Sequence, residues 1–264
     1  MTFFEHLEEL RRRLKVAVGV FIVAFVFMLT FSIQPTSLGQ TAIWLPVPTA
    51  DQGQTIPAQF IVLLNHSLVQ GSAVLVVLTP WEAVIAQLKV GMFLAAVITS
   101  PVTTYEFWRF IAPGLKPRER RLVFRIATPV VSLFLLGVLV SLLVVLPFTF
   151  PFLYAFARAF GAQPFLRFED FLDFVLMFSL AFGLSFELPV VMYGLSYLGI
   201  VQPEFWKRNW RYAAIAIFIF GAVITPDGSG VTMMFVAMPM LALYVAGYIA
   251  VARRAKKIAR TKSS

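Results

Sequence analysis

The 264-residue sequence contains no cysteine and only two histidines, His6 and His66. The absence of cysteine excludes disulfides and thiolate metal sites, and two histidines so far apart argue against a histidine-based metal centre. Charged residues are scarce as well, at 13%, whereas 59% of the residues are hydrophobic and the mean hydropathy is +0.84. This combination is typical of an integral membrane protein. We therefore expect no metal ion and no cofactor.

Long stretches without charge mark the segments that cross the membrane, because an ionised group at the bilayer centre costs roughly 2.5–3.5 kcal/mol. Trimmed at turn residues, these stretches predict an all-α integral membrane protein, a single polytopic domain with six transmembrane helices. A helix of about 20 residues spans the hydrocarbon core, and the fifth segment is shorter than that. The predicted spans are about 14–33, 88–107, 123–146, 171–196, 210–225 and 231–250.

The distribution of the basic residues predicts the topology. Of 22 lysines and arginines, all but Lys89, Arg158 and Arg167 fall in the N-terminal segment, the second and fourth loops, and the basic tail 251–264. Lys and Arg concentrate in cytoplasmic loops, so both termini are predicted to be cytoplasmic. The net charge of +9 follows this loop pattern, and we expect no nucleic-acid binding.

Two segments resemble other kinds of structure. Residues 56–78 are apolar enough to mimic a span, but counting them as one would place the first two basic clusters on opposite faces. Residues 34–86 are therefore predicted to form an enlarged external loop without Lys or Arg, partly helical and resting on the membrane surface. Residues 2–10 are acidic and amphipathic, unlike the start of a signal peptide. This favours an interfacial helix over residues 2–13 that leads into an uncleaved first span.

The acidic residues are the candidates for chemistry. Glu187 is the sole acid well inside a predicted span, and an intramembrane carboxylate is a functional hypothesis by default. The alternative is a neutral acid hydrogen-bonded to a neighbouring helix, with carbonyls freed at Pro189. Asp227 is predicted to lie in an external turn between the last two spans. Glu169, Asp170 and Asp173 open the fourth span, where they suit the positive end of the helix dipole.

Glu9 and Glu119 are predicted to face the same compartment, each among several arginines. A guanidinium binds a carboxylate bidentately, so these residues could receive arginines from a partner. The alternative is a local surface ion pair, such as Glu9 with Arg12 or Arg13, worth less than about 1 kcal/mol. Glu106 is a further carboxylate in the basic loop, and it too could either pair with a local arginine or receive an arginine from a partner.

Several of these segments, in the same order, resemble the TatC family, the signal-peptide-receptor subunit of the twin-arginine protein translocase. The resemblance runs from about residue 3 to residue 250. The matching segments are 5–14 (EHLEELRRRL), 100–101 (SP), 107–121 (FWRFIAPGLKPRERR), 182–189 (FGLSFELP) and 225–227 (TPD).

The resemblance implies a cupped monomer of six transmembrane helices in the bacterial cytoplasmic (inner) membrane, with both termini inside. It implies binding of twin-arginine signal peptides of folded cargo proteins, recruitment of TatA/TatB-type single-span subunits into an oligomeric complex, and export driven by the proton gradient. By matching position, Glu9 and Glu119 receive the two arginines, Leu10, Arg11 and Phe110 are their neighbours, and Glu187 makes polar contact with partners inside the membrane. The first external loop is roughly twenty residues longer than in familiar members.

Other functions agree less well with the sequence. A proton-coupled transporter using Glu187 would predict inverted repeats or paired broken helices, and the sequence has no internal repeat. An intramembrane enzyme would need a nucleophile–base pair or two facing aspartates within the spans. A nucleotide-driven machine would need a Walker-type loop, which is absent. A membrane scaffold, in which Glu119 and Glu187 are both dispensable, stays open.

Overall fold

A computed structural model describes residues 3–38, 41–69, 71, 73–111, 117–225 and 230–263. Within this part of the chain, five helices are long and apolar enough to cross a membrane, and two apolar helices are shorter, Ile56–Val69 and Trp210–Ile224. The last of these is the fifth predicted span. The chain divides into two compact units. Unit one comprises Met1–Pro113 and Phe150–Leu176, and unit two comprises Gly114–Thr149 and Met177–Ser264.

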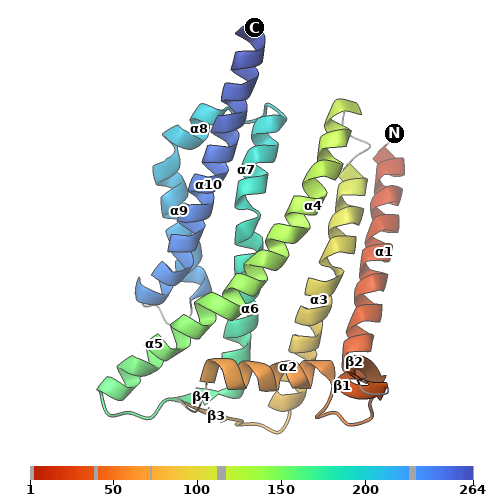
Figure 1. The fold of residues 1–264 in the computed structure, drawn as a ribbon, viewed down its shortest axis with the longest axis vertical. Coiled ribbons are helices and arrows are strands. Elements are labelled where there is room, and N and C mark those ends of the chain that lie inside the picture. Colours follow the sequence, from red (N-terminus) through yellow and green to blue (C-terminus); the bar gives the residue numbers. More distant parts are fainter. Residues whose placement is uncertain are drawn as a thin grey trace. The chain divides into compact units, whose positions relative to one another are not determined.

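Unit one is built on two long helices, α1 (Phe3–Thr30) and α3 (Glu82–Ile111), which lie side by side (Figure 1). They run antiparallel. Arg13, in the first half of α1, pairs with Glu106 near the end of α3, whereas Phe25, near the end of α1, lies against Gly91 in the first half of α3. The α1–α3 contact is close at Gly91, where an added Cβ would lie 3.1 Å from the Phe25 ring. The two helices therefore place their charged ends next to one another.

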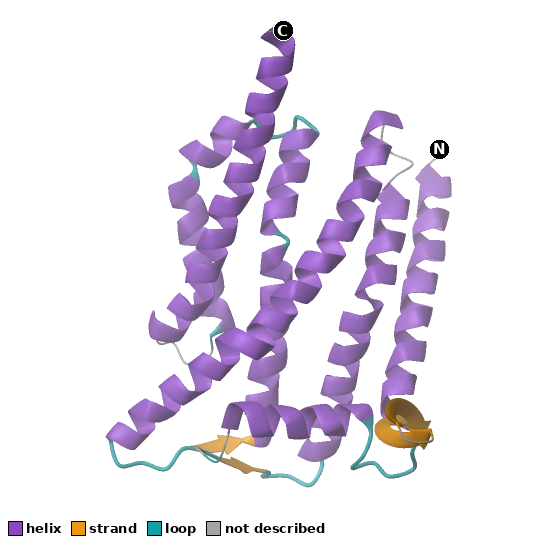
Figure 2. Cartoon of the chain, in the orientation of Figure 1, coloured by secondary structure: helices purple, strands orange, loops and turns teal. Residues whose placement is uncertain are grey.

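The loop between α1 and α3 contains both strands and helices. Strands β1 (Phe31–Leu38) and β2 (Thr41–Pro48) form an antiparallel hairpin, drawn in orange beside the end of α1 in Figure 2. Helix α2 (Ile56–Leu64) continues into a π-helical turn, η1 (Asn65–Val69), and lies across the end of α3 (Figure 1). Helical structure in this loop was expected from the sequence, but the hairpin was not.

A second, parallel pair of strands joins distant parts of unit one. Strand β3 (Val74–Val76) pairs with β4 (Phe165–Arg167), so the segment before α3 lies beside the segment before α6 (Phe168–Phe186). This pairing brings the first turns of two membrane helices together at one place. The aromatic core nearby is formed by Phe150 and Phe171, whose ring centroids are 5.3 Å apart.

Unit two contains the remaining helices and the second half of α6. The elements are α4 (Pro117–Val140), η3 (Ser141–Val145), the first turn of α5 (Leu146–Ala159), α7 (Leu188–Tyr197), α8 (Pro203–Arg208), α9 (Trp210–Ile224) and α10 (Gly230–Ser263). Helix α10 packs on α7, α8 and α9. Helices α4 and α6 cross at Gly137 and Gly183, and the buried hydroxyls of Ser141 and Ser179 share a hydrogen bond of 3.2 Å.

Beyond helices that are longer than predicted, such as α3 and α10, three differences from the predicted boundaries change the course of the chain. Helix α1 is continuous from Phe3, without a separate interfacial helix. The third helix does not end near residue 146 but continues through the π-helical turn η3 to Ala159. The fourth is interrupted at Glu187, because Pro189 lacks the N–H that a continuous helix would need.

Candidate functional site

Glu9 lies near the start of α1 and pairs with two arginines that follow it on the same helix. Arg13 lies one turn further on, and its Nε donates to Glu9 Oε1 at 2.7 Å, while Arg12 Nη2 lies 2.9 Å from Oε2. The two arginines differ in exposure, since the Arg12 side chain is 66% exposed and that of Arg13 only 12%. The local ion pairs considered from the sequence are therefore both present in the structure.

Arg13 also binds a carboxylate on a different helix. Its Nη1 donates to Glu106 Oε2 of α3 at 2.8 Å, and the Glu106 side chain is only 10% exposed. One guanidinium thus bridges Glu9 and Glu106 across the α1–α3 contact. We call Glu9, Arg12, Arg13 and Glu106 the paired-carboxylate site. Of the two arginines, Arg13 is the one held in place from both sides.

Aromatic residues of α1 and α3 lie beside this site. The His6 ring stacks on the Phe110 ring with centroids 4.6 Å apart. The indole N–H of Trp108 is buried and has no hydrogen-bond acceptor within the described residues. Leu10 and Arg11, the other two predicted neighbours, are exposed on α1. Four predicted residues, Glu9, Leu10, Arg11 and Phe110, therefore lie at one end of the α1–α3 pair.

Two predicted residues fall outside what the structure describes. Glu119 belongs to the first turn of α4, but its side chain is not among the described ones. Asp227, the predicted external turn, lies in the undescribed segment between α9 and α10. Their assignments remain predictions.

Glu187 lies at the junction between α6 and α7. Its N–H donates to Leu184 O at 3.1 Å and its carbonyl accepts from Val191 N–H at 2.9 Å, so the backbone groups of Glu187 itself stay hydrogen-bonded at the junction. The side chain is partly buried, and its Oε1 is sealed from solvent without a donor among the described residues. A buried carboxylate oxygen without a donor is costly, so this atom is suited to receive a polar group from outside the chain.

A second charged cluster lies where β4 and α6 meet α3, and we call it the α3–α6 ion network. Arg167 donates to the fully buried Glu82 at 3.0 Å, and Lys89 Nζ lies 2.8 Å from Glu169 and 2.7 Å from Asp173. The hydrogen bond to Glu82 raises the pKa of the Arg167 guanidinium above its usual value. Glu169 and Asp173, which the sequence suggested only as helix-dipole partners, therefore pair with a lysine 80 or more residues away.

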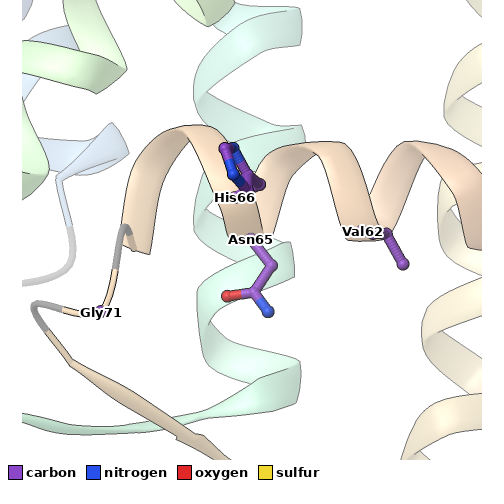
Figure 3. A pocket seen from close by; sticks show the side chains of 4 residues that line it. All are labelled: Val62, Asn65, His66 and Gly71. Atoms are coloured by element: carbon purple, nitrogen blue, oxygen red, sulfur yellow. The ribbon is translucent and has the colours of Figure 1, made fainter.

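The structure also contains a cavity in the enlarged loop, of about 560 Å³, lined by Val62, Asn65, His66 and Gly71. Figure 3 shows Asn65 and His66 at neighbouring positions on the helical turn that borders it. Within the described residues, no group of three or more His, Asp or Glu side chains is arranged to hold a metal ion. The cavity lies apart in sequence from every residue of the paired-carboxylate site.

Sequence reasoning missed the Arg13–Glu106 pair. Glu106 was noted as a carboxylate within a basic loop, but its arginine comes from a segment 93 residues earlier. Only the antiparallel packing of α1 and α3 brings the two together. The sequence does hold one indication of this pair, because Arg13 and Glu106 both flank long apolar segments on the same predicted face of the membrane.

Comparison with known proteins gives a consistent result. The profile of the family described as "Sec-independent protein translocase protein (TatC)" matches residues 5–239. The protein of that name from Cenarchaeum symbiosum is 40% identical over 257 residues, 97% of each chain, and that from Carboxydothermus hydrogenoformans is 29% identical, covering 92% of this chain and 90% of its own. A crystal structure of the twin-arginine translocase receptor TatC superposes with a TM-score of 0.72 at 28% identity, covering 94% of this chain and 98% of the other.

Proposed function

Because the chain belongs to the TatC family of Sec-independent protein translocase proteins, we propose that it is the receptor that binds twin-arginine signal peptides, with Glu9 as an arginine acceptor. It is a multi-pass membrane protein of the Sec-independent translocase, and we propose that it acts as a receptor and not as an enzyme. The observation that supports the site is the position of Glu9, which already binds guanidinium groups at the α1–α3 contact.

The geometry suits arginine in particular. A guanidinium presents several N–H groups in a planar fork that matches a carboxylate, whereas a lysine ammonium is a compact, strongly hydrated charge. Glu9 is held in a fixed place by Arg13, so a second guanidinium meets a carboxylate that is already oriented. Glu119 supplies the second carboxylate in this proposal, and Leu10, Arg11 and Phe110 provide the surface around the two arginines.

Glu187 has a separate role in the proposal. It is the polar contact inside the membrane for the inserted signal peptide or for TatA/TatB-type single-span subunits. Its buried Oε1 without a donor supports this role, since a partner's hydroxyl or amide would satisfy it. In this proposal the assembly lies in the cytoplasmic (inner) membrane, both chain termini are cytoplasmic, and the proton gradient drives export of folded cargo.

Binding of a fluorescent twin-arginine signal peptide to the protein in nanodiscs tests the receptor function. We expect binding that is at least about 10-fold tighter than that of the twin-lysine peptide, since a hydrogen bond to a charged group contributes on the order of 1.5–3 kcal/mol and lysine cannot form the bidentate pair. Glu9→Ala and Glu119→Ala should each weaken binding without reducing membrane insertion. Glu187→Ala should leave this first binding step intact and reduce crosslinking to single-span partners.

Peptide binding, export and partner crosslinking together distinguish the alternatives. Equal binding of the twin-arginine and twin-lysine peptides would reject the carboxylate assignment. Normal export by the Glu9→Ala/Glu119→Ala double variant would favour a scaffold, and unchanged partner crosslinks in Glu187→Ala would return that residue to a structural role.

A further inference from the structure

Cationic residues occur on α8, at the start of α9 and in the second half of α10. Helix α8 lies beside α9 and α10 (Figure 1) and is hydrogen-bonded to the end of α7. Five of the six cations are exposed and the sixth, Arg254, is partly exposed. We call them, together with Trp206 and Trp210, the basic-aromatic surface. Its cations are Lys207, Arg208, Arg211, Arg253, Arg254 and Lys256.

These cations lack acidic partners. Within the described residues none of the six forms an ion pair, whereas Arg13, Lys89 and Arg167 each bind two carboxylates. The acid on α8 itself, Glu204, is exposed and forms no ion pair among the described residues either. Exposed cations that have no carboxylate partner in the described part of the chain favour an anion from outside the protein.

Specific contacts hold the surface in shape. The Trp206 indole Nε1 donates to Ser196 Oγ of α7 at 2.8 Å, and the Tyr244 hydroxyl of α10 donates to the Trp206 carbonyl at 2.7 Å. The Arg254 guanidinium carbon lies 3.7 Å from the centroid of the Tyr197 ring on α7. Helix α8 is thereby fixed to both of its neighbours, and the cations are displayed on a rigid support.

Apolar and aromatic side chains are exposed next to the charges. Phe205 is 44%, Trp210 55% and Tyr212 73% exposed. Aromatic rings of this kind are enriched at the level of the lipid headgroups, where one part of the ring is apolar and another is wet. A soluble acidic ligand would make use of the charges alone, whereas a lipid would use the charges and the exposed rings together.

We propose that the basic-aromatic surface binds the headgroups of anionic phospholipids, with α8 lying in the interfacial layer. The phosphodiester would sit among Lys207, Arg208 and Arg211, and the acyl chains would lie beside Phe205 and Trp210. This surface lies in unit two, away in sequence from Glu9 and Phe110, and the inference stands whether or not the protein binds signal peptides. Such binding would anchor the α8–α10 end of the protein in an anionic leaflet.

Native mass spectrometry of the detergent-purified full chain tests this proposal with phosphatidylglycerol and phosphatidylcholine as probes. We expect the wild-type protein to retain phosphatidylglycerol at least about 10-fold more strongly than phosphatidylcholine. The Lys207→Gln/Arg208→Gln/Arg211→Gln variant should lose that preference, since each cation near an anionic surface contributes about a five-fold gain in affinity.

Two matched variants make the result specific. Lys15→Gln/Arg109→Gln/Arg158→Gln removes the same charge from exposed positions in unit one and should keep the preference. Lys207→Arg/Arg208→Lys/Arg211→Lys retains the charge and should also keep it, and thermal unfolding would confirm that every variant is folded. Equal retention of the two lipids by the wild type would overturn the proposal, as would an equal loss of preference in the unit-one variant.

Discussion

At the scale of single residues, the environment of Glu9 is the most informative feature. Its two arginines are sequence neighbours on one helix, yet one is exposed and held by Glu9 alone, whereas the other is buried and shared with Glu106. An exposed ion pair is worth little, so Arg12 can leave Glu9 at small cost. Arg13 cannot leave without stranding the buried Glu106 carboxylate. We infer that Arg12 is the internal competitor of an incoming arginine and that Arg13 is a positioning residue.

Neighbouring substitutions should therefore change peptide binding in opposite directions. Arg12→Gln should tighten binding of the twin-arginine peptide by about two- to five-fold, because it removes an exposed competitor. Arg13→Gln should weaken it by about 10-fold, because Glu9 loses the group that orients it and Glu106 is left unpaired. Both would be measured by fluorescence anisotropy in nanodiscs, with melting temperatures as the control for folding. Tighter binding in both variants would mean that Arg13 is also a competitor.

How far this site was predictable depends on the residue. Glu9, Leu10, Arg11 and Phe110 were singled out from motifs that are contiguous in sequence, and they do lie at one end of the α1–α3 pair. Neither the Arg13–Glu106 bridge nor the stacking of His6 on Phe110 could be predicted. Both depend on the register between two helices, and the hydrophobic pattern of each helix alone does not define that register.

At the scale of the secondary-structure elements, close backbone approach determines how the helices of unit two pack. A Cβ added at Gly137 of α4 would lie 2.7 Å from the Phe182 carbonyl and 2.9 Å from the Gly183 Cα of α6, both of which are backbone atoms. Small residues let membrane helices approach closely in this way. The hydrogen bond between Ser141 and Ser179 lies further along the same contact.

Gly137→Ala should therefore destabilise the protein by about 1–3 kcal/mol, because the two helices must separate to accept the methyl group. Gly19→Ala on α1 is the matched control, since a Cβ at that position has no neighbour within 4 Å. Thermal unfolding in detergent followed by circular dichroism would compare the two variants. Equal melting temperatures would show that the α4–α6 contact adapts without cost.

The α3–α6 ion network allows a test of a buried charge. Arg167→Leu leaves Glu82 buried without its arginine, although Leu78 N–H still donates to it at 2.9 Å. We expect a loss of about 1–3 kcal/mol in the free energy of unfolding. The Glu82→Gln/Arg167→Leu double variant should recover part of that loss, because no uncompensated charge remains. A double variant less stable than Arg167→Leu would indicate that Glu82 stabilises the fold independently of Arg167.

The sequence predicts which apolar helices form better than it predicts where each helix begins and ends. The absence of charge identified the apolar helices, because burying charge in lipid is costly whatever the tertiary structure. The continuation of α4 through η3 into α5 was not predicted, since Pro147 and Pro151 are usually read as helix ends. Here both lie within α5, directly after the π-helical turn η3. The β1–β2 hairpin was missed because its three prolines, Pro35, Pro46 and Pro48, argue against strand.

At the scale of the whole molecule, the asymmetry of the basic residues is the main argument for topology. The unpaired cations of α8 and α10 and the arginines of α1 fall in segments that the sequence assigns to one side of the membrane. On the side predicted to be external the cations are Arg158, Arg167 and, at the edge of a span, Lys89. Two of these, Lys89 and Arg167, pair with carboxylates of the α3–α6 ion network. The topology rule counts Lys and Arg and not net charge, so these three cations oppose the predicted orientation only by their small number.

The absence of cysteine allows this topology to be measured without a background signal. Gln52→Cys places a single thiol in the exposed turn before α2, and Thr2→Cys and Ser264→Cys place one at either end of the chain. In intact cells a membrane-impermeant maleimide should label Gln52→Cys alone, because the cationic tail resists transfer across the membrane. Thr2→Cys and Ser264→Cys should react only after permeabilisation. Labelling of Ser264→Cys in intact cells would place the tail outside and, with it, the basic-aromatic surface of α8 and α10.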